Sequence, residues 1–373
     1  MRKFVSPSLL IIFFILSAAG HYAHWPATWQ FIISAVAVIC VAGFLGKATE
    51  SVAHYAGQRL GGFLNATFGN AAELIIGILL VREGLFDMVK ASITGSIIGN
   101  LLLVLGLSLF AGGLKHKIQR YNVSLAGMNG SLMIVAIIAL FVPAIFLQTH
   151  VLHEEDRTTL SLVVAGILIV SYLLWLVFSM ITHKDYLADV TEAGKGANKE
   201  VATDSDSIGL ATAGGSHELP PAWSRGKSIA YLILATVMVA FVSEWLVGTL
   251  DTFTERFGLS EIFVGAFVVA IVGNAAEHSA AVLLAMKNKI GASVEIAVGS
   301  SLQIALFVAP VLIFVSHLFG RPMDIVFTVV ELAAIGVSVF IAKSITQDGQ
   351  TNWYEGLLLI AVYAILGVSF YLV

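Results

Sequence analysis

The stretch NATFGNAAELIIGILLV, residues 65–81, holds the letters GNAAE inside an apolar run, and the same five letters recur in AFVVAIVGNAAEHSAAVLLAM, residues 266–286. The two copies begin at Gly69 and Gly273, which are 204 residues apart. Each copy places a glutamate inside a segment that is long and apolar enough to cross a membrane. An ionisable residue at that depth is costly and usually faces partners or a water-filled cavity. The repeated pair therefore indicates a paired ion site.

The composition predicts an all-α, polytopic membrane protein. The chain has 373 residues, of which 58% are hydrophobic and 12% are charged, and its mean hydropathy is +0.91. A soluble domain carries about 25% charged residues. The apolar runs do not alternate, which excludes a β-barrel. The single cysteine, Cys40, excludes an intramolecular disulfide framework, and a net charge of −4 gives no indication of a nucleic-acid partner.

The apolar runs predict about eleven transmembrane helices. The first run follows Arg2 and Lys3 and also resembles a signal peptide, although we favour a retained helix. The expected spans cover residues 7–20, 28–55, 60–81, 88–111, 124–147, 160–181, 228–250, 262–286, 293–318, 325–345 and 355–373.

Lysine and arginine predict the orientation, because they are enriched in cytoplasmic loops. With eleven spans and a cytoplasmic N-terminus, fifteen of the 20 basic residues fall on the inside. The five on the outside are Arg82, Lys90, Arg157, Arg256 and Arg321. The C-terminus is therefore expected outside the cell.

A long polar segment, residues 183–224, divides the chain into two halves. It is rich in glycine, alanine, serine and threonine with scattered acidic residues, which predicts a flexible cytoplasmic linker. Simple connection and regulation both remain open as its role. The expected organisation is an N-terminal helix (1–24), a first five-helix repeat (25–182), this linker, and a second five-helix repeat (225–373).

The two halves correspond with inverted topology. The offset of 204 residues that relates the two GNAAE copies also relates Gly95 and Ser96 to Gly299 and Ser300. Corresponding spans are five apart in the chain. Because five is odd, they enter the membrane from opposite sides. Inverted repeats place substrate sites at the repeat interface, near the middle of the bilayer.

The repeated motifs and the facing helices (TGSIIGN, residues 94–100, and VGSSLQ, residues 298–303) supply carboxylates, amides and hydroxyls. Within each GNAAE copy the asparagine and the glutamate are three residues apart, which places them on one face of a helix. Each glycine, one turn before a glutamate, admits a neighbouring helix or a bend. The predicted site consists of Glu73, Glu277, Asn70, Asn274, Gly69, Gly273, Ser96, Asn100, Ser300 and Gln303.

This all-oxygen set suits a hard cation such as Ca²⁺. Two carboxylates neutralise one divalent cation, and without a cation they take up protons in a low-dielectric setting. Competition between cation and protons for one site is the minimal physics of an antiporter. The competing interpretation is that GNAAE is a helix-packing face with a hydrogen-bonded glutamate, which the inverted duplication makes less favourable.

Three further residues have two interpretations each. Glu50 and Glu244 lie on the corresponding spans two and seven, either as proton or gating groups or as solvated residues near helix ends. His278 follows Glu277 directly and therefore points about 100° away around the helix. It either assists protonation or packs in the protein interior.

The sequence resembles the Ca²⁺/H⁺ exchangers, or CAX proteins, of the cation/Ca²⁺ exchanger superfamily, over essentially its whole length. The resemblance is carried by ATES (48–51), RLGGFLNATFGNAAELII (59–76), TGSIIGNLLLVLGLS (94–108), IVGNAAEHSAAVLLAMKNK (271–289) and VEIAVGSSLQIALFVAP (294–310). It implies exchange of Ca²⁺ for protons in a bacterial plasma membrane without a cofactor. It also implies that Glu73 and Glu277 act as cation ligands and proton carriers, with the neighbouring amides and hydroxyls lining the site. Many relatives carry a dense acidic run between the halves, which this linker lacks.

Other functions of a polytopic membrane protein compete with this interpretation. A Na⁺-coupled exchanger of the same superfamily is the main alternative, and a cation channel is a weaker one. The sequence has no HExxH, GxSxG or aspartyl-pair motif, so an enzyme is not expected. The expected partners are Ca²⁺, protons and the lipid bilayer, with no nucleic acid, and a homo-oligomer is compatible with the sequence.

Overall fold

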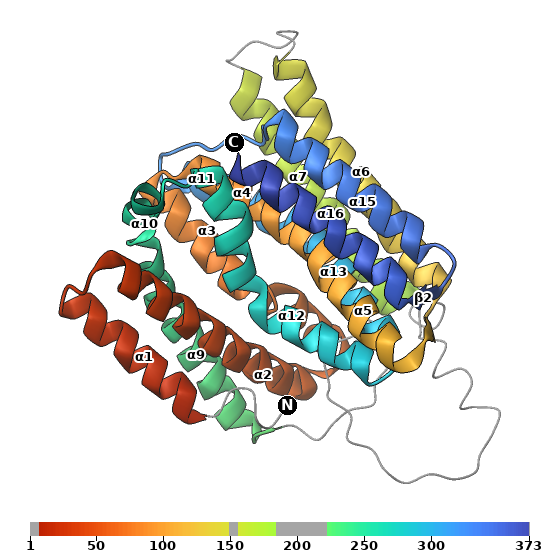
Figure 1. Cartoon of the computed structure of the whole chain (residues 1–373), viewed down its shortest axis with the longest axis horizontal. Coiled ribbons are helices and arrows are strands. Elements are labelled where there is room, and N and C mark those ends of the chain that lie inside the picture. Colours follow the sequence, from red (N-terminus) through yellow and green to blue (C-terminus); the bar gives the residue numbers. More distant parts are fainter. Residues whose placement is uncertain (1–6, 149–155, 184–221, 373) are drawn as a thin grey trace.

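The computed structural model describes residues 7–148, 156–183 and 222–372, and they are almost entirely helical (Figure 1). Residues 184–221, most of the expected linker, lie outside the described residues, so its role stays a prediction. The first half comprises α1 (Pro7–Tyr22), α2 (Ala27–Phe68), α3 (Ala71–Glu83), α4 (Phe86–Ile98), η1 (Gly99–Val104), α5 (Leu105–His116), β1 (Ile118–Arg120), α6 (Val123–Gln148), α7 (Asp156–Val177) and η2 (Phe178–Thr182). The second half comprises α9 (Arg225–Val247), α10 (Leu250–Phe257), α11 (Glu261–Phe263), η4 (Val264–Val269), α12 (Ala270–Met286), α13 (Ile290–Gln303), η5 (Ile304–Val308), α14 (Ala309–Leu318), α15 (Val329–Thr346), β2 (Gln350–Asn352) and α16 (Trp353–Tyr371).

The expected all-helical membrane fold is confirmed. Nine helical stretches among the described residues are long and apolar enough to cross a bilayer. Two other expected spans take different forms. The first is the short apolar helix α1, and the third is divided between the end of α2 and α3. The number eleven for the crossings therefore stays a prediction.

The first GNAAE copy differs from the expected continuous helix over residues 60–81. Helix α2 runs on from Ala27, bends at Gly57 and ends at Phe68. Gly57 has φ 77°, a backbone conformation that essentially only glycine adopts without strain. Helix α3 then begins at Ala71, so Asn70 stands outside the helix, with φ −99° and ψ 22°. The expectation that Asn70 and Glu73 share a helix face is therefore wrong for this copy.

The second copy is helical throughout, because α12 includes Gly273, Asn274 and Glu277. Glycine and asparagine are both poor helix formers, which permits a break at either copy. In α12 the Asn274 Nδ2 atom donates to the Ala270 carbonyl (2.9 Å), one turn earlier, so this side chain is satisfied within an intact helix. The five letters GNAAE therefore do not by themselves decide whether the helix breaks.

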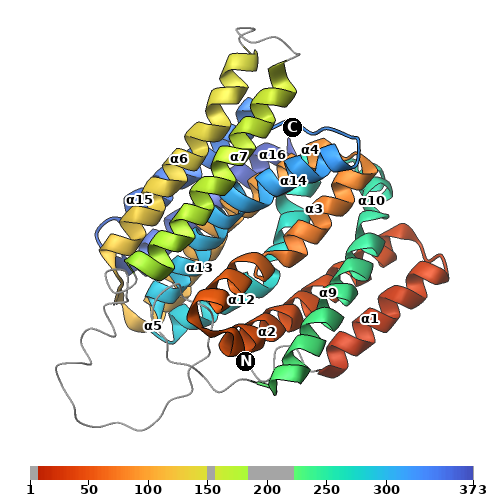
Figure 2. The ribbon, with the colours of Figure 1, turned by 180° about the vertical axis from the view of Figure 1, so that it is seen from behind.

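The helices form two groups, with α3 and α12 between them (Figures 1 and 2). Helices α1, α2 and α9 pack together on one side. The other group contains α5, α6, α7, α13, α15 and α16, in which α5 packs along α16 and α6 along α15. Helix α12 contacts both α2 and α5. This places the second GNAAE copy between the two groups.

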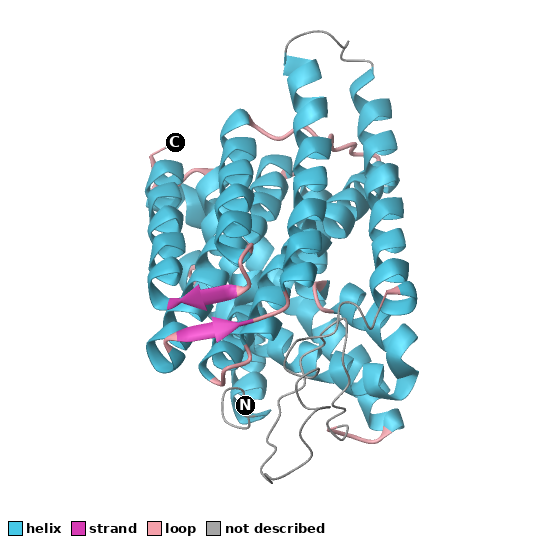
Figure 3. Cartoon of the chain, turned by 90° about the vertical axis from the view of Figure 1, so that its right-hand side faces the viewer, coloured by secondary structure: helices cyan, strands magenta, loops and turns pink. Residues whose placement is uncertain are grey.

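A small sheet ties the two halves together at one end of the bundle (Figure 3). Strand β1 pairs with β2 in antiparallel register, with Gln119 opposite Thr351. Nearby, the Tyr121 hydroxyl donates to the Thr346 carbonyl (2.8 Å). Because β1 follows α5 and β2 precedes α16, the sheet fixes loops of both halves to each other.

Candidate cation site

The two motif glutamates meet at the interface between the halves, each against the glycine of the other copy. A Cβ atom built on Gly273 would lie 3.3 Å from Glu73 Cγ and 3.5 Å from its Oε1. A Cβ atom built on Gly69 would lie 3.9 Å from Glu277 Oε1. The absence of a side chain at Gly273 therefore gives room to Glu73, whereas the atom closest to a Cβ on Gly69 is the Asn65 carbonyl oxygen, at 2.6 Å.

The two carboxylates have different partners. Ser300 on α13 donates its hydroxyl hydrogen to Glu277 Oε2, at 2.6 Å. Glu73 lies in the first turn of α3, where the helix N-terminus favours a negative charge. Its Oε2 atom is buried and has no hydrogen-bond partner among the described residues. One glutamate is thus already held by a hydroxyl, while the other retains an unused acceptor atom.

Amide groups of the two halves are joined to each other and to a hydroxyl by hydrogen bonds. Asn274 Nδ2 donates to Ser96 Oγ (2.9 Å), and Asn100 Nδ2 lies 3.4 Å from Asn274 Oδ1. On the other side, Asn70 Nδ2 donates to Gln303 Oε1. Helices α4, η1 and α13 therefore supply the polar partners of the motif asparagines, as the matched positions in the sequence suggested.

Two of these amide oxygens, Asn70 Oδ1 and Asn100 Oδ1, are also buried without a partner in the described part of the chain. Both residues are almost completely buried, with 1% and 0% exposure. A buried acceptor without a donor is costly unless water or a cation satisfies it. Glu73 Oε2 is unpaired in the same way, and oxygen atoms of these kinds are the ligands that hard cations prefer.

Short π-helical turns follow the site in both halves, which the sequence did not predict. The turn η1 (Gly99–Val104) includes Asn100, and η5 (Ile304–Val308) begins directly after Gln303. The offset of 204 residues relates the two turns to within one residue. Such turns often occur at functional sites. Their apolar sequences, GNLLLV and IALFV, carry no signal that distinguishes them from ordinary helix.

The backbones of α4 and η4 are in close contact beside the predicted site residue Ser96. A Cβ atom on Gly95 would lie 1.9 Å from the Ala266 carbonyl oxygen, so α4 and η4 touch backbone to backbone. At the corresponding position of the other half, Gly299 has nothing within 4 Å of such an atom. The two halves therefore pack differently at these two corresponding glycines.

The three remaining candidate residues, Glu50, Glu244 and His278, have different surroundings. Glu244 lies at the end of α9, with 47% of its side chain exposed and an oxygen atom 3.0 Å from Arg82 Nη2. Glu50 lies on α2 and is half-buried. His278 on α12 has a buried Nε2 atom with no partner among the described residues.

Comparisons with known proteins agree with this architecture. The chain matches the family described as sodium/calcium exchanger protein over residues 26–181 and 227–372. A Ca(2+)/H(+) antiporter from Aphanothece halophytica is 44% identical over 363 residues, covering 97% of this chain and 95% of that protein. The Ca(2+)/H(+) antiporter ChaA of Bacillus subtilis is 44% identical over 369 residues, covering 97% and 99%.

A solved structure shows the same fold over nearly the whole length. The structure of native YfkE superposes with a TM-score of 0.80 at 40% sequence identity and covers 98% of this chain and 99% of its own. The resemblance noted from the motif segments is thereby confirmed. The chain is an integral membrane protein and belongs to the sodium/calcium exchanger family of the cation/Ca²⁺ exchanger superfamily.

Proposed function

We propose that this protein is a secondary active transporter that exchanges Ca²⁺ for protons by alternating access. The observation that carries the proposal is the placement of Glu73 and Glu277 at one interface, each against the glycine of the opposite motif. One site built from both repeats can be exposed to either side of the membrane when the repeats move relative to each other.

The proposed chemistry is competition between one divalent cation and two protons. With Ca²⁺ bound, both carboxylates are ionised and together balance its charge. When Ca²⁺ leaves, two buried negative charges without a cation are strongly unfavourable, so each carboxylate takes up a proton. The site then carries the same net charge in both states, which allows both to cross the apolar interior.

Neutral oxygen atoms complete the proposed coordination. Asn70 Oδ1 and Asn100 Oδ1 lack donors within the described residues and supply two of them. Calcium takes six to eight oxygen ligands, so side-chain oxygens beyond the two carboxylates are needed. Asn274, Gln303, Ser96 and Ser300 hold these groups in position through the hydrogen bonds described above.

Protons are favoured over sodium as the coupling ion. Three relatives at 44% identity are named as Ca²⁺/H⁺ antiporters. Sodium-calcium exchanger structures, with 16% identity and a TM-score of 0.54, share the fold alone. We propose a bacterial plasma membrane location, with the N-terminus and the linker in the cytoplasm, and Ca²⁺ efflux powered by inward proton flow.

Glu50 and His278 are proposed to participate in proton transfer, whereas Glu244 is proposed to remain a solvated end of α9. Glu50 carries a carboxylate on the span that leads to the first motif, and His278 adjoins Glu277. The half-exposed ion pair of Glu244 with Arg82 resembles an ordinary surface pair.

Uptake of Ca²⁺ into proteoliposomes tests the proposal. We expect an imposed pH gradient to drive uptake without sodium, and dissipating the gradient with a protonophore to stop it. Uptake driven by a sodium gradient but not by a pH gradient would establish the sodium-coupled alternative. Downhill Ca²⁺ flux that cannot drive protons uphill would indicate a channel.

A further inference from the structure

Helix α3, which carries the first motif glutamate, ends in a left-handed turn. The Gly84 amide donates to the Val81 carbonyl (3.1 Å), and Gly84 has φ 86°, which glycine adopts without strain. The Leu85 amide donates to the Leu80 carbonyl (3.0 Å). Such a turn satisfies only these two of the last carbonyls of a helix, so that of Arg82 is left for a partner from elsewhere.

Helix α12, which carries the second motif glutamate, ends in the same turn at positions 204 residues later. The Asn288 amide donates to the Ala285 carbonyl (3.0 Å), and Asn288 has φ 60°, which asparagine tolerates better than most residues. The Lys289 amide donates to the Leu284 carbonyl (2.9 Å). The carbonyl left over is that of Met286, which corresponds to the one left over in α3.

Each leftover carbonyl accepts a hydrogen bond from a side chain of the opposite half. Arg321, three residues beyond the end of α14, donates from Nη1 to the Arg82 carbonyl (2.9 Å). A Cβ atom on Gly84 would lie 3.0 Å from this Nη1 atom, so the glycine also leaves room for the guanidinium group. His116, the last residue of α5, has its Nε2 atom 3.0 Å from the Met286 carbonyl oxygen, and the imidazole donates because a carbonyl only accepts. We call these two contacts the α3 cap and the α12 cap.

The two caps are reciprocal and hold the cation site from opposite ends of the bundle. The offset of 204 residues relates the two donors to within one residue. The stretch Phe86–His116 is one run of 31 helical residues, which starts just after the α3 cap and ends at the α12 cap. Helix α14 packs against α3, and α5 packs against α12 (Figure 2). Each motif glutamate precedes the capped carbonyl of its helix by nine residues, which is roughly 14 Å along the helix axis.

The charges around the two caps differ. At the α3 cap, the Arg82 side chain lies 3.2 Å from Glu83 and 3.0 Å from Glu244, so carboxylates accompany the two guanidinium groups. Near the α12 cap, four lysines flank the donor and the acceptor in the chain: Lys115, Lys117, Lys287 and Lys289. A neutral imidazole donates there without adding positive charge, whereas the Arg321 cation is attracted by the carbonyl end of α3.

A second side chain of the first half reinforces the α12 cap. Gln119 Nε2 donates to the Ala285 carbonyl (2.9 Å) and to Asn288 Oδ1 (3.0 Å). Gln119 is 1% exposed and lies in β1, so the sheet that joins the halves also holds this helix end. The end of α12 is therefore held by more contacts than the end of α3, where Arg321 is exposed.

We propose that Arg321 and His116 are positioning residues for the cation site, through the motif helices that they cap. A helix is a rigid element, so a held end fixes the place of the glutamate on the same helix. Without the cap, the helix can shift and misplace its carboxylate, and small displacements of a functional group are costly. This role rests on the proposed function, in which Glu73 and Glu277 bind Ca²⁺.

Ca²⁺ binding by the purified full-length protein, measured by isothermal titration calorimetry, tests this role. Arg321→Ala should raise the dissociation constant about threefold or more, and His116→Ala about twofold, since Gln119 still holds the end of α12. Arg321→Lys and His116→Gln keep a donor and should recover most of the lost affinity. Because Arg321 is exposed and His116 is half-buried, alanine leaves no closed cavity, and the variants should fold.

Hydrogen–deuterium exchange of the same variants shows whether each cap is lost. Arg321→Ala should speed amide exchange in residues 80–86, and His116→Ala in residues 284–290, because an uncapped helix end opens more readily. Each variant should leave the end of the other motif helix unchanged.

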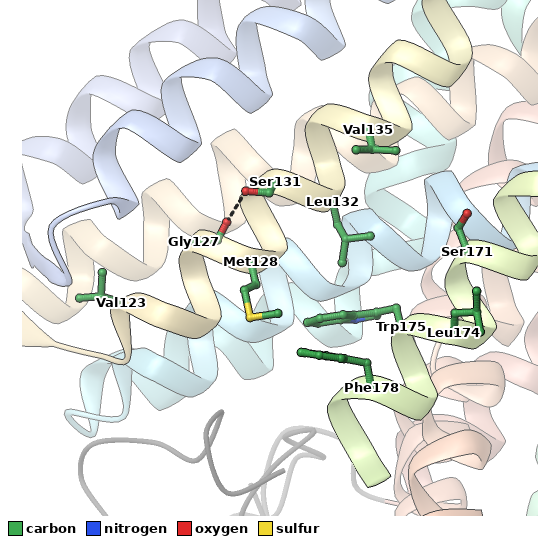
Figure 4. Close-up of a pocket in the computed structure, with 10 residues that line it drawn as sticks. All are labelled: Val123, Gly127, Met128, Ser131, Leu132, Val135, Ser171, Leu174, Trp175 and Phe178. Atoms are coloured by element: carbon green, nitrogen blue, oxygen red, sulfur yellow. Dashed lines mark hydrogen bonds between the residues drawn. The ribbon is translucent and has the colours of Figure 1, made fainter. Parts of the chain in front are cut away.

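Three control variants separate the caps from other effects. Lys115→Ala and Arg256→Ala remove other exposed basic residues and should bind Ca²⁺ as the wild type does. Leu132→Ala is the control for a general loss of stability, because Leu132 lines an apolar groove between α6 and the end of α7 that contains neither cap (Figure 4). It should also leave the dissociation constant unchanged.

Faster exchange at one helix end, together with weaker Ca²⁺ binding that the conservative variant restores, would support the positioning role. Unchanged exchange in the alanine variants would show that the caps are absent, and faster exchange with unchanged affinity would show that they only fasten the helix ends. An equal loss of affinity in Leu132→Ala, or no recovery in Arg321→Lys and His116→Gln, would show a general effect on stability. Each of these results would overturn the positioning role alone. A wild-type protein that binds no Ca²⁺ would instead overturn the proposed function, and the positioning role with it.

Discussion

Glu73 lies directly against Gly273, its Cγ only 3.3 Å from the position that a Cβ on that glycine would take. The two residues belong to opposite halves of the chain and to opposite copies of one motif. The reciprocal contact, Glu277 with Gly69, is looser at 3.9 Å. Only Gly273 is in tight contact with the other copy's carboxylate, whereas the closest neighbour of Gly69 is the Asn65 carbonyl oxygen, at 2.6 Å.

Replacing either motif glutamate with glutamine should abolish exchange while leaving a folded, membrane-inserted protein. Glutamine keeps the shape and one neutral oxygen but cannot ionise or carry the proton. A single carboxylate would leave bound Ca²⁺ with an uncompensated positive charge inside the membrane, which is strongly unfavourable. Ca²⁺ uptake driven by a pH gradient measures the effect of Glu73→Gln and Glu277→Gln.

The exposed Glu255→Gln on α10 is the control for charge removal and should transport normally. If GNAAE is only a packing face, the outcome reverses: both glutamine variants are tolerated, and larger residues at the motif glycines are harmful. Near-normal exchange by either glutamine variant contradicts the two-carboxylate mechanism.

Replacing the amide residues should lower the apparent affinity for Ca²⁺ without abolishing transport. Alanine at Asn70, Asn274 or Gln303 removes a buried hydrogen-bonding or ligating group, which costs about 1–3 kcal/mol. We expect the apparent Ca²⁺ affinity to fall about 5- to 150-fold at each position, with residual transport at high Ca²⁺. The concentration dependence of uptake gives this value, and the exposed Gln347→Ala serves as control. Unchanged affinity in all three variants would remove them from the site.

Alanine at two corresponding glycines should give opposite results. Gly95→Ala pushes a Cβ atom to within 1.9 Å of the Ala266 carbonyl oxygen, so α4 and η4 must separate. Such overpacking costs about 1–3 kcal/mol or more, and we expect a lower thermal unfolding temperature or little folded protein. Gly299→Ala meets nothing within 4 Å and should leave that temperature unchanged or raise it, since alanine favours helix. Equal behaviour of the two variants would show that the close helix contact is absent.

Protons should weaken Ca²⁺ binding at the site. Each carboxylate that binds Ca²⁺ must be deprotonated, so binding releases protons and is favoured at higher pH. If two protons are exchanged for one Ca²⁺, the dissociation constant rises by up to about a hundredfold for each unit of pH decrease in the range where both carboxylates are protonated. Calorimetry in buffers of different ionisation enthalpy counts the released protons. A pH-independent dissociation constant would be inconsistent with competition.

Much of the site was predictable because it depends on residue chemistry repeated along the chain. The two GNAAE copies, their depth in apolar runs and the odd separation of five spans between them predicted that both glutamates lie at a shared interface. The pairings of Ser300 with Glu277 and of Asn274 with Ser96 join helices that the matched positions had already brought together. The position of Glu244 was left open, since sequence alone does not show that its side chain reaches Arg82.

The sequence by itself determined an all-helical membrane protein and predicted two related halves with a paired carboxylate site, because hydrophobicity and buried charge are properties of the residues themselves. Only the tertiary structure decided that the chain breaks before Asn70 but stays helical through Asn274. The five letters of the motif are identical, so they do not by themselves distinguish the two conformations. The two asparagines differ in their contacts with distant residues, since Asn70 donates to Gln303 and Asn274 donates to Ser96.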